Sequence, residues 1–196
     1  MMKKLCMIGL AAMLATPAAF AGQMPAGQVA GYLTMTDAEF DDGTGLGIRG
    51  WASVSGPWFV HGEYQTVGLE TPGPAGIDVD LNELRVGGGL VGEMQKGIMW
   101  IAKAELVDFG GDFDEGGFGV HGGLMFEPAP ALGLFATLGF LTTDNTDGLE
   151  LNFGGEYSFT KAVSGILDYR TYMGEADGGG DFEITDIRFA VAYNFY

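Results

Sequence analysis

Cysteine, basic residues and long hydrophobic runs are all scarce in this chain of 196 residues. Its one cysteine, Cys6, rules out an internal disulfide and a metal site built from cysteines. Lysine and arginine total 9 against 26 aspartates and glutamates, so the formal charge is −17, which excludes the basic surface that nucleic-acid binding requires. No apolar run approaches the roughly 20 residues of a membrane-spanning helix. A helical membrane protein is therefore excluded, whereas a β protein is not.

The N-terminal segment has the features of a secretory signal peptide. Lys3 and Lys4 precede an apolar run over 5–15, and the small-residue triplet Ala19-Phe20-Ala21 follows Pro17. A positive start, a short apolar stretch and small residues at the cleavage site are typical of export signals. We predict that residues 1–21 are removed and that residues 22–196 form one domain.

Apolar and polar residues alternate along the rest of the chain, and this period of two predicts β-strands. The clearest stretch runs without a slip from Asp186 to the last residue, Tyr196. The pattern predicts ten strands, at 28–36, 44–55, 58–67, 81–91, 98–107, 118–126, 131–141, 149–159, 162–172 and 186–196.

The connections between these strands alternate between two lengths. Those at 55–57, 92–97, 127–130 and 160–161 are short, whereas those at 37–43, 68–80, 108–117, 142–148 and 173–183 are longer. Short turns at one end, longer loops at the other and an even strand number are typical of outer-membrane barrels. We therefore predict an all-β fold, a transmembrane antiparallel up-and-down β-barrel of ten strands, with eight strands as the alternative.

Charged residues sort by position in this assignment. The apolar face of each strand points outward, and a one-residue slip would move Arg49 into lipid at a cost of about 2 to 4 kcal/mol. The charged side chains then point into the lumen. In a narrow lumen these charged side chains can pair and fill the interior, and a partly hydrated lumen is the alternative. The longer connections hold many acids and no basic residue. We predict a luminal charge network formed by Arg49, Glu63, Glu83, Arg85, Lys103, Glu105, Glu150, Glu156, Asp168, Arg170, Asp186 and Arg188.

The end of the chain resembles the C-terminal signature of bacterial outer-membrane barrels, through Val191, Tyr193 and Phe195, with Tyr196 one residue beyond the usual aromatic terminus. Together with the export signal and the alternation, it makes the chain similar to small outer-membrane barrels of the OmpA/OmpX type or the opacity type. The resemblance implies residence in the outer membrane, among its lipid and lipopolysaccharide. It also implies escort by periplasmic chaperones and insertion by the barrel assembly machinery, with these four residues as the assembly signal. It leaves the particular family, the ligand and the oligomeric state open.

A glycine-rich motif at 45–50 spells G-x-G-x-x-G, the pattern of dinucleotide-binding loops. That chemistry needs a strand before the motif and a helix after it, whereas residues 51–54 continue the strand alternation. We therefore interpret the glycines as packing residues and predict no cofactor.

Two histidines, His61 and His121, invite a catalytic interpretation. A barrel lipid hydrolase needs a serine beside its histidine, and neither histidine has one. A ten-stranded barrel protease needs a histidine and acids at the external rim, on strands that extend well beyond the membrane, whereas the strands predicted here have membrane length only. We interpret both histidines as hydrogen-bonding residues of the lumen and predict no catalytic residue.

Clustered acids suggest a cation site in the connections. Asp112, Asp114 and Glu115 are candidate ligands for Ca²⁺ or Mg²⁺, as are the acids of 144–147, in a role that would bridge the protein to lipopolysaccharide phosphates. Their spacing matches no EF-hand, and a solvated loop carries acids without a metal. The solvated loop is the favoured interpretation.

These observations predict a non-enzymatic outer-membrane barrel with a structural or surface-interaction role and a lumen largely filled by side chains. Three alternatives remain. The first is a narrow pore for small solutes or ions, which the uncharged sector around Thr137 and Gly139 would allow. The second is a barrel enzyme at the cell surface. The third is a soluble periplasmic barrel that binds a lipid, which would place Arg49 and Glu63 in water.

Overall fold

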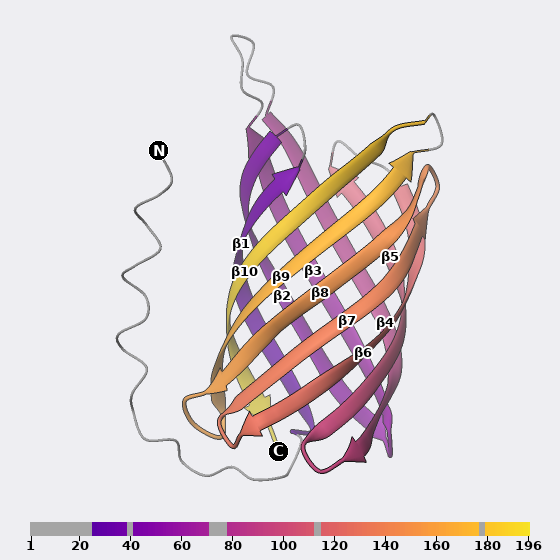
Figure 1. Cartoon of the computed structure of the whole chain (residues 1–196). Coiled ribbons are helices and arrows are strands. Elements are labelled where there is room, and N and C mark those ends of the chain that lie inside the picture. The colour runs from indigo at the N-terminus through magenta and orange to yellow at the C-terminus, as the bar shows by residue number, and fades with distance from the viewer. Residues whose placement is uncertain (1–24, 39–40, 71–77, 112–114, 177–178) are drawn as a thin grey trace.

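Ten antiparallel strands follow one another around a closed barrel in the computed structural model, which describes residues 25–38, 41–70, 78–111, 115–176 and 179–196 (Figure 1). Each strand pairs with the strands before and after it, and β10 closes the barrel by pairing with β1. The predicted up-and-down barrel of ten strands is therefore confirmed, and the eight-strand alternative is wrong. The strands are β1 (Gly27–Ala38), β2 (Asp41–Ser55), β3 (Trp58–Glu70), β4 (Asp78–Gln95), β5 (Ile98–Gly111), β6 (Glu115–Ala129), β7 (Leu132–Thr143), β8 (Thr146–Ser158), β9 (Val163–Ala176) and β10 (Asp181–Phe195).

Side chains alternate between the lumen and the outside along each strand, as the pleat of a β-strand requires. In β1, Leu33 is 59% exposed on the outer wall, whereas its neighbours Tyr32 and Thr34 are buried inside. The other strands repeat this pattern, so the barrel has an apolar outer wall around a polar interior. Exposed residues of the wall include Leu46, Ile48, Val60, Val86, Leu106, Val120, Leu138, Leu167, Phe189 and Val191.

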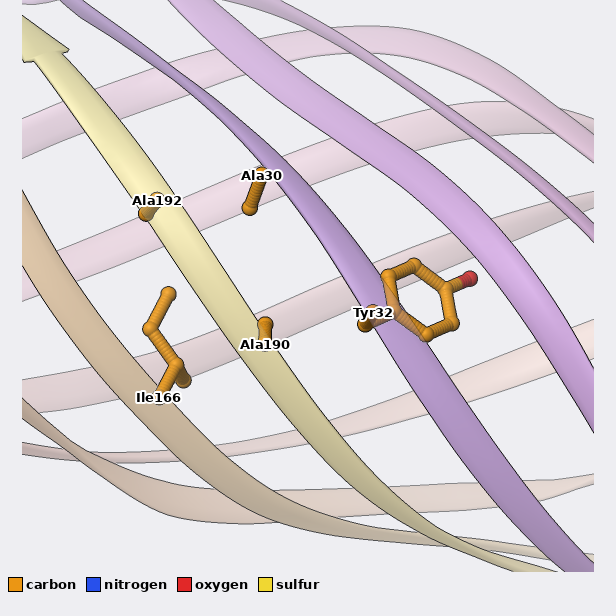
Figure 2. Packing of buried hydrophobic residues seen from close by; sticks show 5 residues of the cluster. All are labelled: Ala30, Tyr32, Ile166, Ala190 and Ala192. Atoms are coloured by element: carbon orange, nitrogen blue, oxygen red, sulfur yellow. The ribbon is translucent and has the colours of Figure 1, made fainter.

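The seam between β1 and β10 is packed by small side chains on its inner face. Figure 2 shows Ala30 on β1 beside Ala190 and Ala192 on β10, with Ile166 of β9 against them. Tyr32 lies in the same cluster, and its hydroxyl points away from β10. The alanines leave room for the large side chains that project into the lumen from the neighbouring strands.

The two ends of the barrel differ. At the turn end, tight connections such as the one through Gly56 join the strands. The strand β1 begins at this end and β10 finishes there, with Gly27 paired to Phe195. The opposite end, the loop end, carries the remaining connections (Figure 1).

Most strands are longer than the alternation predicted. The extra residues lie mainly at the loop end, and β4 and β6 are also extended at the turn end, to Gln95 and Ala129. The shortest have 12 residues and β4 has 18, whereas about 9 to 11 suffice to cross a membrane. The prediction of membrane-length strands is therefore wrong. The apolar outer face ends before the strand does. Backbone pairing can continue past it, because the hydrogen bonds between strands do not depend on apolar side chains. In β10, for example, Asp181 still pairs with Glu175 in register.

This extension changes the surroundings of several acids that were assigned to loops. Asp37, Asp108 and Asp181 are strand residues that alternate onto the exposed outer face, beyond its apolar part. The predicted signal peptide, residues 1–21, lies outside the described residues, so cleavage there stays a prediction. In the part of the chain that is described, no helix is long and apolar enough to cross a membrane.

Candidate functional site

The candidate site is the luminal charge network, whose twelve side chains all alternate onto the inner face of the wall. Burying an ion costs several kcal/mol unless partners compensate for the lost water. The partners of each group therefore decide what the lumen can do. Eight members are buried and come from five different strands: Glu83, Arg85, Glu105, Glu150, Asp168, Arg170, Asp186 and Arg188.

The first part of the network surrounds Arg188 of β10. Its guanidinium contacts Asp168 of β9, the residue opposite it in register, and its Nη1 lies 2.8 Å from Glu63 Oε1 across the lumen. Arg49 Nη2 approaches the other oxygen of Asp168 at 2.7 Å. Both guanidinium groups lie over the ring of Tyr32, at 5.4 and 5.7 Å from its centroid, within the range of cation–π attraction.

The second part is built around Arg170 of β9. Its Nη2 lies 2.6 Å from Asp186 Oδ2, on the adjacent strand, and 2.7 Å from Glu83 Oε2, on β4. Thr36 donates a hydrogen bond of 2.6 Å to the second oxygen of Asp186. Glu83 also pairs with Arg85, so this carboxylate links the second part of the network to the third.

The third part centres on Arg85, which reaches acids on both sides of it. Its Nη1 lies 2.8 Å from Glu105 Oε1, and its Nη2 lies 2.6 Å from Glu150 Oε2. Lys103 Nζ contacts the remaining oxygen of Glu105 at 2.7 Å. The last member, Glu156, lies nearer the turn end and accepts hydrogen bonds from the neutral side chains of Gln28 and Ser164.

Both histidines alternate onto the inner wall, but the interpretation of hydrogen-bonding histidines is wrong in detail. Among the described residues, His121 makes no hydrogen bond through either ring nitrogen, and His61 makes none through Nε2. Both lie at ion-pair distance from Glu105, His61 at 3.4 Å and His121 at 3.0 Å. These contacts are short but lack the geometry of a hydrogen bond.

Several neutral residues complete the network, and the sequence analysis did not single them out. Tyr32 donates a hydrogen bond of 2.7 Å to Glu63 and lies 3.2 Å from Gln65 Oε1. Thr34 and Thr36 both donate to Asp186. The alternation predicts that these residues of β1 point inward, but only the closed barrel shows which acids they contact.

At the level of Arg85 and Arg170, side chains from opposite walls meet across the lumen, as in the ion pair of Arg170 with Glu83. A cavity of about 20 Å³ remains between these residues, Gln65 and Glu83, which is space for about one water molecule. The uncharged sector around Gly139, which the narrow-pore alternative would need, is occupied at that level by the ring of His121, because a Cβ on Gly139 would overlap it.

The loop end has a separate hollow of about 920 Å³, which is lined by acids of four strands, including Asp37, Asp147 and Glu175, together with Phe140 and Tyr169. Of the candidate cation ligands, Asp112 and Asp114 lie outside the described residues. Glu115 belongs to β6 and accepts a hydrogen bond of 2.8 Å from Thr143.

The residues of the predicted assembly signal lie at the end of β10. Val191, Tyr193 and Phe195 are exposed on the outer wall, and the rings of Tyr193 and Phe195 pack edge to face at 5.3 Å. Tyr196 follows the strand and does not belong to it.

Comparison with solved structures shows the same fold in known barrels. The KdgM porin superposes with a TM-score of 0.50 at 11% sequence identity, over 85% of this chain and 99% of that chain. The Neisserial surface protein NspA gives 0.47 at 12% identity over 89% and 100%, and Ail of Yersinia pestis gives 0.45 at 11% over 88% and 100%. At 11% identity the likeness to the KdgM porin concerns the fold alone, and at that level it confirms the predicted barrel. No protein-family profile and no curated protein matches the sequence.

Proposed function

We propose that this chain is an integral outer-membrane protein without catalytic activity, which keeps its lumen closed and acts through its loop end as a structural or surface-interaction protein. The observation that carries the proposal is the buried ionic network, whose side chains pair across the lumen around a cavity of about 20 Å³.

The membrane location is supported by the outer wall. Apolar side chains such as Leu106, Leu138 and Val191 are more than half exposed on it, and a soluble protein rarely exposes so continuous an apolar surface. The predicted export signal fits the same location. We further propose that lipid and lipopolysaccharide cover this wall, after delivery by chaperones and insertion by the barrel assembly machinery.

Cell fractionation tests the location. We expect the mature protein in the outer-membrane fraction, with gel migration that changes on boiling. Recovery from the soluble periplasm, without heat-modifiable migration, would favour the soluble lipid-binding barrel.

Planar-bilayer recording tests the closed lumen, with the KdgM porin as a positive control. We expect no steady conductance steps from the purified protein. Steady steps would overturn the closed lumen and favour the narrow pore, and replacing Arg170 with glutamine should then alter the ion selectivity of those steps.

The absence of catalysis is also part of the proposal. Strands that extend at the loop end remove one argument against a rim protease, since such an enzyme needs long strands. The position of the histidines still argues against it: His121 is buried in the middle of β6, paired with Lys103 and Gly139, and His61 lies near the turn end.

A further inference from the structure

The inner face of the wall changes from charged to apolar near the loop end. On three strands, the inward residue that follows a charged member toward the loop end is apolar and buried. These pairs are Glu83 and Leu81 on β4, Glu105 and Val107 on β5, and Arg170 and Tyr172 on β9. The ionic network is therefore bounded on its loop-end side by apolar side chains.

Two buried clusters form this boundary, which we call the apolar layer. Val67, Leu69 and Leu81 make up one cluster, and Val107, Leu141 and Tyr172 make up the other. Phe109 of β5 packs against both clusters and joins them. Since β5, β7 and β9 do not pair with one another in the wall, the second cluster is built across the lumen and not along the sheet.

The apolar layer packs directly against the backbone of the wall. Val67 lies over Gly45, and the ring of Tyr172 lies over Gly148. A Cβ on Gly45 would come within 2.8 Å of the first side chain, and a Cβ on Gly148 within 2.7 Å of the second. Larger residues at these two positions would push the apolar side chains apart, so the glycines allow the layer to close.

The small cavity in the lumen lies where the apolar layer meets the ionic network. Leu81, Phe109 and Leu141 line it from the layer, and Glu83, Arg85 and Arg170 line it from the network. Its volume of about 20 Å³ holds about one water molecule. A chain of water molecules cannot pass through a space of this size.

The exposure of the charged side chains falls in the direction of the apolar layer. On β5, the side chain of Lys103 is 22% exposed, whereas that of Glu105, the next inward residue toward the loop end, is fully buried. On β3, Glu63 is partly exposed, whereas Gln65, the next inward residue, is buried. Water therefore reaches the network from the turn end.

An ion that entered the apolar layer would lose its water and meet no charged partner there. Burial of an uncompensated ion costs several kcal/mol, and apolar constrictions exclude water and ions from channels for this reason. The network differs from the layer, because its own charges can replace part of the water around an ion. The two levels of the lumen thus act differently on a solute.

We propose that the apolar layer is a seal against water and ions, and that the lumen is a vestibule open at the turn end alone. The turn end of an outer-membrane barrel faces the periplasm. The ionic network would then exchange water and small ions with the periplasm and not with the cell surface. This inference rests on the proposed closed lumen, and it names the level at which the lumen is closed and the side from which it is reached.

Thiol labelling tests the one-sided access. The single cysteine, Cys6, lies in the predicted signal peptide, so a chain that begins at Gly22 has no thiol of its own. The inward-facing Thr137 lies on the turn side of Leu141 on β7, and Asp181 lies at the loop end. We expect Thr137→Cys/Asp181→Cys in sealed lipid vesicles to take one label per molecule from an external charged thiosulfonate, whichever way the barrel is inserted. Intact-mass spectrometry counts the labels.

Thr137→Cys/Lys96→Cys is the matched control, because Lys96 lies in a connection of the turn end. We expect two labels on molecules whose turn end meets the reagent and none on the others, with the thiosulfonate supplied outside the vesicles or enclosed within them. Two labels on Thr137→Cys/Asp181→Cys would overturn the seal. At most one label on the control in both arrangements would overturn the open vestibule.

A reporter on the network side of the apolar layer tests the layer itself. Gln65→Cys provides it, because Val67 is the next inward residue toward the loop end. In lipid nanodiscs, where the reagent meets both ends, we expect Phe109→Ala to raise the labelling rate of Gln65→Cys severalfold. Phe135→Ala is the control, since Phe135 packs against the separate cluster of Ala30 and Tyr32, and it should leave the rate unchanged.

An unchanged rate in Phe109→Ala would show that the ionic network alone excludes the reagent, and an equal rise in Phe135→Ala would show that the barrier lies toward the turn end. Either result overturns the seal. Heat-modifiable migration checks that both variants fold, and the vesicle experiment does not depend on them. Steady conductance steps from the wild-type protein would overturn the closed lumen and the seal with it. Double labelling of Thr137→Cys/Asp181→Cys in a barrel without such steps would overturn the seal alone.

Discussion

At the scale of single residues, the lumen depends on arginines that each contact more than one carboxylate. Arg170 contacts Asp186 and Glu83, and Arg188 contacts Asp168 and Glu63. Removing Arg170 leaves Asp186 without an ion-pair partner among the described residues and leaves Glu83 paired with Arg85, and an uncompensated buried charge costs about 3 to 5 kcal/mol. The loss of stability on removing a charged group therefore depends on which buried partners then lack an ion pair.

Arg170→Met should lower the free energy of unfolding by about 3 to 5 kcal/mol, because Asp186 stays buried without an ion-pair partner among the described residues. Lys103→Met is the matched control: its side chain is 22% exposed and Glu105 keeps Arg85, so we expect a loss of about 1 kcal/mol or less. Urea unfolding in lipid vesicles gives both values. Equal losses would show that burial and shared partners do not govern the network.

Gly47 of β2 makes room for Tyr32, because a Cβ at this position would overlap the tyrosine ring. Gly47→Ala should move the ring away from Glu63 and lower the free energy of unfolding by about 1 to 3 kcal/mol. Gly31→Ala is the control, since no heavy atom lies within 4 Å of a Cβ there, and its effect should stay within about 0.5 kcal/mol. The same urea experiment compares the two, and similar losses would contradict the packing role of Gly47.

The sequence predicted part of this residue-level arrangement. Pairs on adjacent strands, such as Asp186 with Arg170, follow from the alternation once the strands are placed side by side. Pairs that cross the lumen, such as Glu63 with Arg188, depend on the diameter of the closed barrel, which no local pattern contains. Tyr32 was missed because its partners become neighbours only after closure.

At the scale of elements, the alternation located all ten strands but not their loop ends. Alternation of apolar and polar residues marks only the part of a strand whose outer side chains are apolar. It ends where the outward-facing residues become polar, as at Glu183 and Asp181 of β10. The hydrogen-bonded ladder continues past that point. The two boundaries therefore differ for a physical reason, and the distance between them is the part of the wall expected to stand clear of the membrane.

The closing pair of β1 and β10 gives a prediction about assembly. Phe195 is the last strand residue, and its carbonyl accepts a hydrogen bond of 2.7 Å from Ala26, whereas Tyr196 follows the strand. We expect deletion of Tyr196 alone to leave the heat-modifiable fraction in outer membranes nearly unchanged, and Phe195→Ser to reduce it severalfold. A greater loss from the Tyr196 deletion would show that the very last residue carries the assembly signal.

At the scale of the whole molecule, the barrel is inverted relative to a soluble protein, with charge inside and apolar side chains outside. Water cannot stabilise such an outer wall, and lipid cannot stabilise the acids at its loop end. The two requirements together place the membrane boundary on the wall itself, between the apolar residues and the outward-facing acids such as Asp181. The depth of a residue along the wall should then determine how well it tolerates a charge.

Leu138 and Asp181 test that dependence, because both face outward but at different heights. Leu138 lies in the middle of β7 and is 56% exposed, with Gly122 and Leu151 beside it, whereas Asp181 begins β10 at the loop end. Leu138→Arg should lower the free energy of unfolding in lipid vesicles by about 2 to 4 kcal/mol, and Asp181→Arg by about 0 to 1 kcal/mol. In a barrel surrounded by water, water would solvate the arginine introduced by Leu138→Arg, and the free energy of unfolding would hardly change. Similar small effects at both positions would therefore argue against a lipid-facing wall, whatever the lumen contains.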